Sequence, residues 1–449
     1  MKFNRNHSYG SEDLTPSAAA TFSVHGQDRK AASPVPQACA TLARMSHASS
    51  ASPSPAALAG LKVLELGQLI AGPFAAKTLA DFGAEVVKIE PPGVGDPLRK
   101  WRLLKDGTSV WWQVQSRNKR SLALDLRTPE GQDVVRRLAA EADVLIENFR
   151  PGALEGWNLA PEALLAANPR LIVLRISGYG QTGPYCTRPG FGVVAEAMGG
   201  LRHLTAEPGR VPVRVGVSIG DTLAALHGVI GILLALQHRH ASGCGQVIDV
   251  ALYEAVFNCM ESLLPEYSAS EAVRGPAGSA MPGIAPTNAY RCADGVYALI
   301  AGNGDSIFRR LMTLIGREDL AVDPTLADNA GRVTRVDELD AVIGAWTAQR
   351  SVDDVLAALE GASVPAGRIY TVADIAADPH YQARGMLQEV HLEDGSSLTV
   401  PGIVPKLSAT PGRHHRNAPT LGQDSTAVLR EIGLTEAQIT ALRERGIVD

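Results

Sequence analysis

Short apolar runs alternate along this chain with longer stretches in which apolar residues recur every three or four positions. LKVLEL (61–66) and AEVVKIE (84–90) are runs dominated by apolar residues, as expected of strands buried on both faces of a parallel sheet. Between them, PFAAKTLADFG has helical periodicity, with Pro73 near its start and Gly83 at its end. A strand, a helix and a strand in such a short stretch predict a βαβ unit with a right-handed crossover.

The same alternation continues further along the chain. Helices are predicted over PEGQDVVRRLAAEA and PEALLAAN, and strands over DVLIEN and RLIVLRIS. VPVRVGV (211–217) predicts a strand before the long apolar helix DTLAALHGVIGILLALQHR (221–239), and GQVIDVALYEAVFNCMESLL predicts one more strand and helix. We therefore expect an α/β fold, with an open, mostly parallel, Rossmann-like sheet in a large domain and a smaller α+β domain.

Changes in composition divide the chain into five predicted segments. Residues 1–57 are rich in Ala, Ser and Pro and have no sustained periodicity, so they predict a disordered N-terminal extension, in which Met45 is an alternative start. The other segments are a large α/β domain at 58–265, a Gly/Pro-rich linker or active-site loop at 266–285, a small domain at 286–380, and a C-terminal segment returning to the large domain at 381–449.

Charge and cysteine content narrow the classes of function. The 449 residues carry 42 basic and 47 acidic side chains, a net charge of −5, which argues against a nucleic-acid-binding surface. The 5 scattered cysteines include no Cys-x-x-Cys pair and the 11 histidines no His-x-x-x-His pair, so we expect no metal site and a reducing cytoplasm. The longest apolar stretch, near 229–236, is shorter than the ~20 residues of a membrane span, so no membrane association is expected.

The turn after the first predicted strand is one candidate site. It reads Gly67-Gln-Leu-Ile-Ala-Gly72, and Glu90 ends the second strand where a dinucleotide-binding fold places its ribose acid. The G-x-G-x-x-G cradle for a pyrophosphate is missing, and the sequence contains no Walker A motif. The turn is either an anion-binding helix N-terminus or a simple tight turn, and the turn alone favours the second interpretation.

A second candidate is the step Gly216-Val-Ser218-Ile-Gly220. It matches the G-x-S-x-G nucleophile elbow and lies between a predicted strand and a predicted helix, which would make Ser218 the nucleophile of an esterase or thioesterase. No His-Gly-Gly oxyanion motif lies upstream, and no clear Asp and His pair follows. The hydrolase hypothesis is therefore the weaker one.

Asp221 follows this turn and is the third candidate. Its predicted place is the N-cap or first position of the long helix, where an acidic side chain is favoured for structural reasons alone. The chemical interpretation is a carboxylate nucleophile at the edge of the sheet where open α/β folds bind ligands. The residues by themselves favour the structural role as a helix cap over the role as a nucleophile.

Five segments taken together carry a resemblance to a known family. They are LKVLELGQLIAGPFAAKTLADFGAEVVKIEPPGVGDPLR, RNKRSLALDLRTPEGQDVVRRL, ADVLIENFRPGALEGW, NPRLIVLRISGYGQTGPY and VGVSIGDTLAALHGVIGILLAL. In these segments the chain strongly resembles the class III coenzyme A transferases, which include the formyl-CoA and carnitine CoA-transferases. The likeness continues more weakly to LGQDSTAVLREIGLTEAQI and spans nearly all of the chain from residue 58.

The resemblance implies a nucleophile, a ligand and an assembly. The family's nucleophile is an aspartate in a Gly-Asp step that opens a long helix, here Gly220-Asp221. Coenzyme A, a co-substrate and not a permanently bound cofactor, is implied to lie across the carboxyl ends of the sheet. Family members form interlocked homodimers, so we expect one here. The coenzyme A contacts carried over are Ile70, Ala71, Leu124, Asp125, Leu126, Arg127, Asn148, Phe149, Arg150, Pro189, Gly190, Phe191 and Gly192.

The chain also departs from the family pattern. Gly156 stands where some members have an arginine, so other basic residues are needed for coenzyme A. Phe191 stands where the family's 2-methylacyl-CoA racemases have a histidine, so a two-base racemase is disfavoured. The glycine-rich gating loop of oxalate-using members is not reproduced, and we expect 275–283 to form the lid. The expected replacements for the missing arginine are Arg99, Lys100 and Arg102.

The reaction expected is transfer of coenzyme A from an acyl-CoA, with succinyl-CoA as one donor, to a free carboxylic acid. It would proceed through an aspartyl anhydride and an aspartyl-CoA thioester on Asp221. A dicarboxylate acceptor would suit a basic cluster that lies before the catalytic turn and comprises Arg202, His203, Arg210 and Arg214, although surface charge explains the cluster equally well. The alternatives are the Ser218 hydrolase, the racemase and a non-catalytic acyl-CoA-binding protein.

Overall fold

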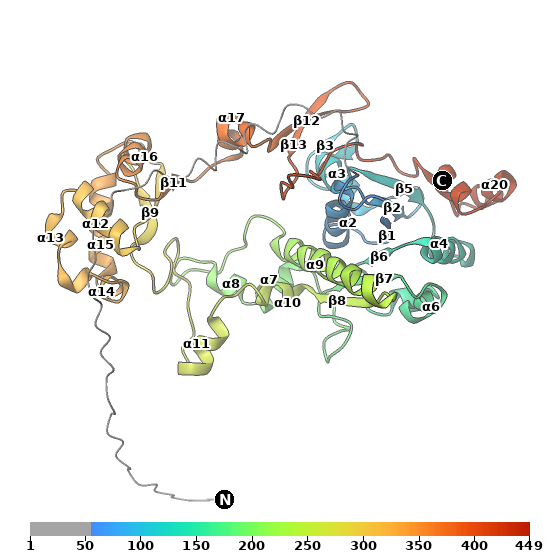
Figure 1. Cartoon of the computed structure of the whole chain (residues 1–449), viewed down its shortest axis with the longest axis horizontal. Helices are drawn as coiled ribbons and strands as arrows, with labels where there is room; N and C mark the ends of the chain where they lie inside the picture. Colours follow the sequence, from blue (N-terminus) through green and yellow to red (C-terminus); the bar gives the residue numbers. More distant parts are fainter. Residues whose placement is uncertain (1–54) are drawn as a thin grey trace, which may run out of the picture. The chain divides into compact units, whose positions relative to one another are not determined.

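The computed structural model describes residues 55–449 of the chain (Figure 1). The predicted N-terminal extension, including the alternative start at Met45, lies almost wholly outside the described residues.

A six-stranded sheet forms the centre of the fold (Figure 1). Its strands are β1 (Lys62–Glu65), β2 (Glu85–Glu90), β5 (Lys119–Ala123), β6 (Val144–Glu147), β7 (Ile172–Ser177) and β8 (Val247–Ala251). Their order is β5-β2-β1-β6-β7-β8 and all neighbours are parallel, which confirms the expected Rossmann-like α/β sheet. The order reverses between β1 and β6, and the crevice at such a point is where open α/β sheets bind ligands.

Helices cover both faces of this sheet and share an apolar core with it on each side. One face carries α2 (Ala71–Asp81), α9 (Ile219–Ser242) and α10 (Leu252–Phe257). The other face carries α4 (Pro129–Glu141), α6 (Pro161–Ala167), α19 (Ser425–Glu431) and α20 (Glu436–Glu444). The last two helices bury Val428, Leu429, Ile439 and Leu442 in that core, so the end of the chain packs on the central sheet.

Helix α9 packs closely on the sheet because glycines lie at its contact face. A Cβ on Gly228 would come within 2.7 Å of the Leu174 side chain, and one on Gly231 within 2.9 Å of Ile248. By length and composition alone α9 could cross a membrane, so the expectation that no segment is long and apolar enough is wrong. Helices of soluble proteins can pass the same test, and α9 packs on the sheet through one face, which includes the buried Ile232.

A second apolar core forms around a three-stranded antiparallel sheet. The sheet comprises β9 (Thr287–Arg291), β10 (Tyr297–Ala301) and β11 (Ala366–Arg368). Its core includes Phe308 of α12 (Asp305–Leu314), Ile343 of α15 (Val336–Thr347) and Leu359 of α16 (Val352–Gly361). The domain boundaries given above remain predictions.

The remaining elements are short. They are η2 (Pro97–Lys100), β3 (Leu104–Lys105), β4 (Thr108–Ser109), α3 (Val110–Gln115), α5 (Ala153–Gly156), α7 (Gly192–Met198), α8 (Leu201–Leu204), α11 (Leu263–Ser270), α13 (Glu318–Ala321), η3 (Pro324–Leu326), α14 (Asn329–Thr334), α17 (Val372–Ala377), α18 (Pro379–Ala383), β12 (Leu387–His391) and β13 (Ser397–Pro401).

Four charged side chains are fully buried beneath the turn that follows β1. Lys88 Nζ lies 2.8 Å from Glu65 Oε1 and 2.9 Å from Asp96 Oδ2, and Lys119 Nζ lies 2.7 Å from Glu65 Oε2. Two cations therefore balance two carboxylates where water is excluded. Buried charges are tolerated when they are paired in this way, and losing one partner of such a pair destabilises a fold strongly.

The same buried groups hold the backbone of the turn between β1 and α2. Lys88 donates to the carbonyl of Gly67 at 2.7 Å, and Lys119 donates to that of Pro73 at 2.8 Å. The Asp96 carboxylate accepts from the N–H of Leu69 at 3.0 Å, and Leu69 has a φ of 64°. A left-handed leucine is unfavourable by itself, so the bond from Asp96 compensates for its conformation.

One predicted strand is wrong and one strand of the sheet was missed. Residues 211–217 form no strand in the described chain, and their backbone has two hydrogen bonds outside regular elements: the N–H of Val213 donates to the carbonyl of Thr205, and the carbonyl of Val217 accepts from the N–H of Ile219. Their alternating side chains are mostly exposed, so the pattern does not report a buried strand here. Conversely, the edge strand β5 was not predicted, because its sequence KRSLA begins with three polar residues.

Candidate active site

Asp221 lies in the first turn of α9, at the carboxyl-terminal edge of the central sheet. It is the third helical residue and Ser218 occupies the N-cap position, so the predicted N-cap or first-position assignment for Asp221 is wrong. The Asp221 side chain lines a cavity of about 610 Å³. An acid in the first turn still gains from the helix dipole, but its carboxylate faces the cavity and is not the cap.

Glycine at position 192 leaves space for the carboxylate of the nucleophile candidate. A Cβ on Gly192, the first residue of α7, would lie 2.1 Å from Asp221 Oδ2. That is far inside van der Waals contact, so any side chain at this position would displace the carboxylate. The backbone of α7 therefore forms one wall of the space that Asp221 occupies.

The charge environment of Asp221 is set by two side chains. Burial is the largest effect and, with the negative charge of Glu196, raises the pKa of Asp221 to about 6, while Arg214 acts in the opposite direction. Glu196 is buried, and Arg214 lies on it with Nε and Nη2 at 3.2 and 3.3 Å from its two carboxylate oxygens. At neutral pH Asp221 is thus ionised but more basic than an ordinary aspartate.

The cavity around Asp221 gathers residues from several distant segments. It is lined by the turn after β1, by the segment after β6 and by the loop between β7 and α7. Of the residues carried over from the family as coenzyme A contacts, those lining it are Ile70, Ala71, Asn148, Phe149, Arg150, Gly190, Phe191 and Gly192.

A neighbouring cavity of about 370 Å³ takes most of the other assigned contacts. Leu124, Asp125, Leu126 and Arg127 line it, and Phe149 lines both cavities. The Phe149 ring meets the Trp157 ring edge to face at a centroid distance of 5.0 Å, which gives this cavity an aromatic wall. Pro189 lines neither cavity, although its two chain neighbours line the larger one.

Asn148 ties two of these segments together at the reversal point of the sheet. Its side-chain amide accepts from the N–H of Gln68 at 2.7 Å and donates to the carbonyl of Gln68 at 2.9 Å. A Cβ on Gly67 or Gly72 would lie 2.8 or 3.2 Å from Asn148 Oδ1. The two glycines are explained by this close approach, so the tight-turn interpretation accounts for them without a phosphate.

Arg99 is unavailable as a replacement for the arginine missing at Gly156. It forms a buried bidentate pair with Glu90 at 2.8 Å and lies 3.8 Å from the centre of the Trp112 ring. Because both oxygens of the Glu90 carboxylate accept hydrogen bonds from Arg99, Glu90 is not free to bind a ribose hydroxyl. Of the other two expected replacements, Lys100 is exposed and Arg102 lies over the Trp111 ring.

The predicted basic cluster is only partly brought to the cavity. Arg214 lines it, whereas Arg202, His203 and Arg210 do not. Sequence reasoning missed Arg188, which lines the cavity from the loop before α7, and it also missed Trp101, Ser177 and Cys186. Only Ser177, which ends a predicted strand, had a sequence signal, because parallel sheets place their ligands at that end of the strands.

The structure offers no support for the hydrolase and racemase alternatives. Ser218 lines the cavity, but no strand precedes it and no histidine is among the described residues that line the cavity, so it lacks both the elbow and a base. Phe191 lines the cavity where a racemase would need an imidazole. In the described part of the chain no cluster of side chains suits a metal ion.

The predicted lid segment lines a different cavity. Residues in the range 274–282 line a space of about 410 Å³ together with Leu201, Leu204 and Met260, apart from Asp221. Its role as a lid stays a prediction.

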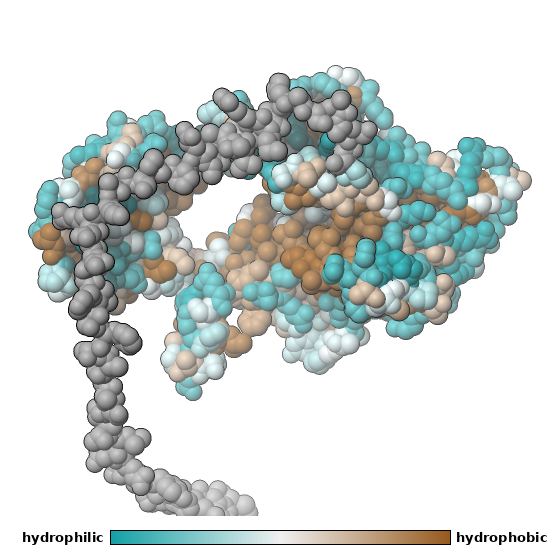
Figure 2. All heavy atoms as spheres, viewed as in Figure 1, coloured by the Kyte–Doolittle hydropathy of each residue, from teal (hydrophilic) through white to brown (hydrophobic). Residues whose placement is uncertain are grey.

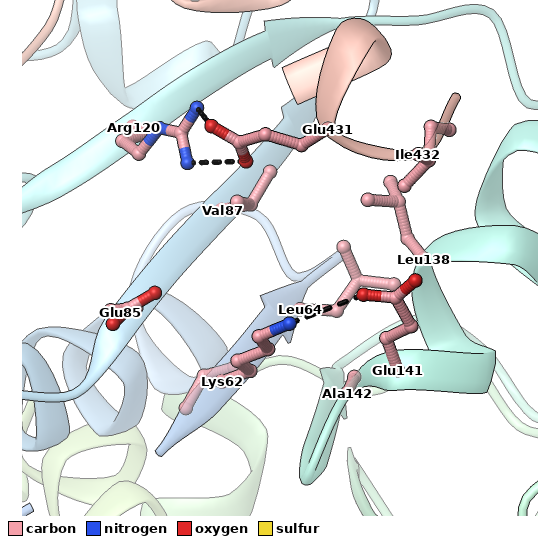
Figure 3. Close-up of a pocket in the computed structure, with 11 residues that line it drawn as sticks. Lys62, Leu64, Glu85, Val87, Arg120, Leu138, Glu141, Ala142, Glu431 and Ile432 are labelled. Atoms are coloured by element: carbon pink, nitrogen blue, oxygen red, sulfur yellow. Dashed lines mark hydrogen bonds and ion pairs between the residues drawn. The ribbon is translucent and has the colours of Figure 1, made fainter. Parts of the chain in front are cut away.

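Another small cavity, of about 80 Å³, lies at the amino-terminal edge of the sheet (Figure 3). Lys62 and Glu85, which begin β1 and β2, line it. Its basic side chains are already paired, Arg120 with Glu431 at 2.7 Å and Lys62 with Glu141 at 3.2 Å. Since open α/β sheets bind ligands at the other edge, this cavity is not the functional site.

Comparison with known proteins places the chain in a family. The family model described as CoA-transferase family III matches residues 58–425. This chain belongs to that family. As a family III CoA-transferase it transfers coenzyme A from an acyl-CoA to a free carboxylic acid, and CoA thioesters are its substrates.

Two curated relatives of this CoA-transferase come from Chloroflexus aurantiacus. Succinyl-CoA–D-citramalate CoA-transferase is 46% identical over 396 residues, covering 88% of this chain and 98% of the relative. The beta subunit of succinyl-CoA–L-malate CoA-transferase is 41% identical over 396 residues, covering 87% and 98%. A crystal structure of a CAIB/BAIF family protein from Brucella suis superposes with a TM-score of 0.74 at 39% identity, covering 84% of this chain and 100% of that one.

The packing of Gly192 against Asp221 leads to a sharp prediction. Gly192→Ala should reduce CoA transfer by about a hundredfold or more, because its Cβ displaces the carboxylate and a shift near 1 Å has an effect of that order. Folding should be unimpaired, since alanine favours a helix over glycine. The measurements are the rate of transfer, followed by mass spectrometry of the CoA products, and the thermal midpoint.

Gly361→Ala is the matched control. Gly361 is also helical, and a Cβ there meets nothing within 4 Å, so transfer should be unchanged. Normal transfer by Gly192→Ala would contradict the placement of the nucleophile.

Proposed function

We propose that this CoA-transferase moves coenzyme A from succinyl-CoA to a dicarboxylic acid, with Asp221 as covalent nucleophile. The observation that carries the proposal is the position of Asp221, whose carboxylate faces the cavity walled by the residues assigned to coenzyme A. The two relatives above are named for succinyl-CoA and for citramalate and malate, which are both dicarboxylates.

The first half of the reaction loads the enzyme. An Asp221 oxygen attacks the thioester carbonyl carbon of succinyl-CoA, the carbon–sulfur bond breaks, and the CoA thiolate leaves behind a mixed anhydride. The thiolate then attacks the Asp221 carbonyl carbon, a carbon–oxygen bond breaks, and succinate leaves. Asp221 now carries coenzyme A as a thioester, and no proton has been gained or lost.

The second half reverses these steps with the acceptor. One acceptor carboxylate attacks the Asp221 thioester carbon and expels the thiolate, forming a new anhydride. The thiolate attacks the acceptor's acyl carbon, which releases the new acyl-CoA and the free Asp221 carboxylate. Each step exchanges one activated acyl bond for another, so a difficult direct exchange becomes several easier ones.

Three arginines among the described residues line the cavity and suit an anionic substrate. Arg214 is already engaged by Glu196, and Arg150 is assigned to coenzyme A. Arg188 lies 3.6 Å from the centre of the Tyr185 ring and has no acidic partner in the described chain. We therefore assign the second carboxylate of the acceptor to Arg188, since a guanidinium matches a carboxylate in a bidentate pair.

The nucleophile is tested by trapping it. Incubation with succinyl-CoA alone should leave an acyl or CoA adduct on Asp221 that hydroxylamine removes, detectable by peptide mass spectrometry. Asp221→Asn keeps the shape of the side chain but removes its charge and nucleophilicity, so it should fold normally and lose both transfer and adduct. Transfer by the Asn variant, with no adduct in the wild type, would contradict the proposal.

The acceptor assignment predicts a selective change in KM. Arg188→Gln should raise the KM for citramalate or malate about tenfold to a hundredfold, the order expected for losing a hydrogen-bonded charge pair, with a small effect on a monocarboxylate such as butyrate. Arg202→Gln, outside the cavity, is the control and should behave like the wild type. An equal rise in KM for butyrate would reject the assignment but leave the nucleophile untouched.

We also propose that the enzyme is a homodimer in the cytoplasm. Leu226, Ile230, Leu233 and Leu234 of α9 are between 41% and 66% exposed, and hydrophobic side chains gather over this helix in Figure 2. A contiguous apolar face of this kind marks an interaction surface in most proteins. The described cysteines are free thiols, which fits a reducing compartment.

Light scattering after gel filtration tests the assembly. The wild-type mass should be that of two chains, and a double Ile230→Glu, Leu234→Glu variant should lose the dimer because two charges would enter its interface. Val322→Glu, which changes a residue that is 80% exposed on another helix end, should remain dimeric. A monomeric wild type would overturn this proposal.

A further inference from the structure

Glu196 is a buried acid beside Asp221 to which the reaction scheme gives no role. It lies on α7 one helical turn after Gly192, so both residues are on the same face of that helix. Gly192 contacts the Asp221 carboxylate, and a Cβ on Gly220 would lie 3.3 Å from Glu196 Cγ. Two carboxylates therefore share the space between α7 and the first turn of α9.

A single arginine contacts Glu196 and acts electrostatically on Asp221. Arg214 lies on Glu196 through two N–H groups, while 41% of its own side chain remains exposed and lines the cavity. Glu196 is only 2% exposed, so its charge is poorly screened by water. Without Arg214, an unpaired buried carboxylate would lie next to the nucleophile, which is an unfavourable arrangement.

The other elements near Asp221 bring two further charged side chains to the cavity, both arginines. Helix α10 contributes Leu252 to the cavity wall, and the start of α2 contributes Ile70 and Ala71. Of the described residues that line the cavity, the only other charged ones are Arg150 and Arg188. The groups that act electrostatically on Asp221 are Glu196, which raises its pKa, and Arg214, which lowers it.

We propose that Glu196 is a positioning residue of the transfer reaction, which anchors Arg214 beside Asp221 and places a second carboxylate next to the nucleophile. The inference rests on the proposed role of Asp221. A more basic carboxylate is a stronger nucleophile toward a thioester, and its basicity approaches that of the second carboxylate of a dicarboxylic acid. Similar basicity keeps the aspartyl-CoA thioester close in energy to the acyl-CoA donor and product, as a reversible exchange requires.

The test is the pH dependence of kcat/KM together with the rate of adduct formation from succinyl-CoA alone. Activity of the wild type should fall as the pH drops through about 6, because Asp221 reacts as a carboxylate and is protonated there. Glu196→Gln keeps an acceptor oxygen for Arg214 but removes the negative charge, so the acid limb should move to lower pH by about 1 unit. The rate on the high-pH plateau should fall severalfold.

Arg214→Gln supplies a shift of opposite sign. Removing the positive charge should move the acid limb to higher pH, while the Gln side chain keeps an N–H donor for the buried Glu196 carboxylate. Glu162→Gln, which changes an exposed acid on α6, is the control and should give the wild-type profile. A purely structural role for Glu196 would change activity at all pH values without moving the limb.

The outcomes separate this inference from the proposed function. Unmoved acid limbs in both variants, with the adduct still on Asp221, would overturn the role of Glu196 and leave the nucleophile in place. No adduct in the wild type would overturn the proposed function first. If the acid limbs of the two variants move in opposite directions and the adduct still forms on Asp221, the results support both the role of Glu196 and the proposed function. If the Gln variant at 196 does not fold, the sign of the Arg214→Gln shift decides alone.

Discussion

The active-site edge of this protein depends on charges buried beneath the first turn of the sheet. Lys88 and Lys119 neutralise Glu65 and Asp96 where water does not reach, and the same groups bind the backbone of the turn that follows β1. Asp96 thereby stabilises Leu69 in a left-handed conformation. Such buried pairs add little to the free energy of folding when compared with apolar residues, but removing one partner destabilises the fold strongly. They therefore keep the turn in one conformation.

That geometry is placed at the reversal point of the strand order. Gln68 lies in this turn, and its backbone N–H and carbonyl form hydrogen bonds with the Asn148 side chain from the segment after β6. Gln68 and Phe149 line both the cavity with Asp221 and the neighbouring one with the aromatic wall. The two cavities adjoin at the crevice where a long ligand can lie across the carboxyl ends of the strands, as open α/β sheets allow.

The nucleophile candidate is controlled by packing and by charge at once. Gly192 leaves room for the Asp221 carboxylate, which a side chain at this position would displace, while Glu196 and Arg214 shift its pKa in opposite directions. Neither effect needs a residue with unusual chemistry. A buried acid becomes an effective nucleophile through what surrounds it, which is the usual way in which folds adjust ordinary side chains.

The sequence by itself determined the class of fold, most of the strands and helices, and the family. Apolar runs report burial on both faces of a sheet whatever the partner strand is, so β1, β2, β6 and β7 could be predicted from the sequence, and the Gly220-Asp221 step marked the candidate nucleophile through the resemblance. The strand at 211–217 was misread because an alternating pattern on an exposed segment looks the same as one on a sheet.

Only the tertiary structure decided how the charged residues divide their roles. The sequence does not distinguish the environments of its arginines. In the structure, Arg99 is buried against Glu90, Arg188 and Arg214 line the cavity, and Arg202 lies outside it. The helix position of Asp221 and its contact with Gly192 also depend on how α7 meets α9. Local pattern records whether a residue is buried, whereas the pairing of charges depends on contacts between distant segments, which no local pattern contains.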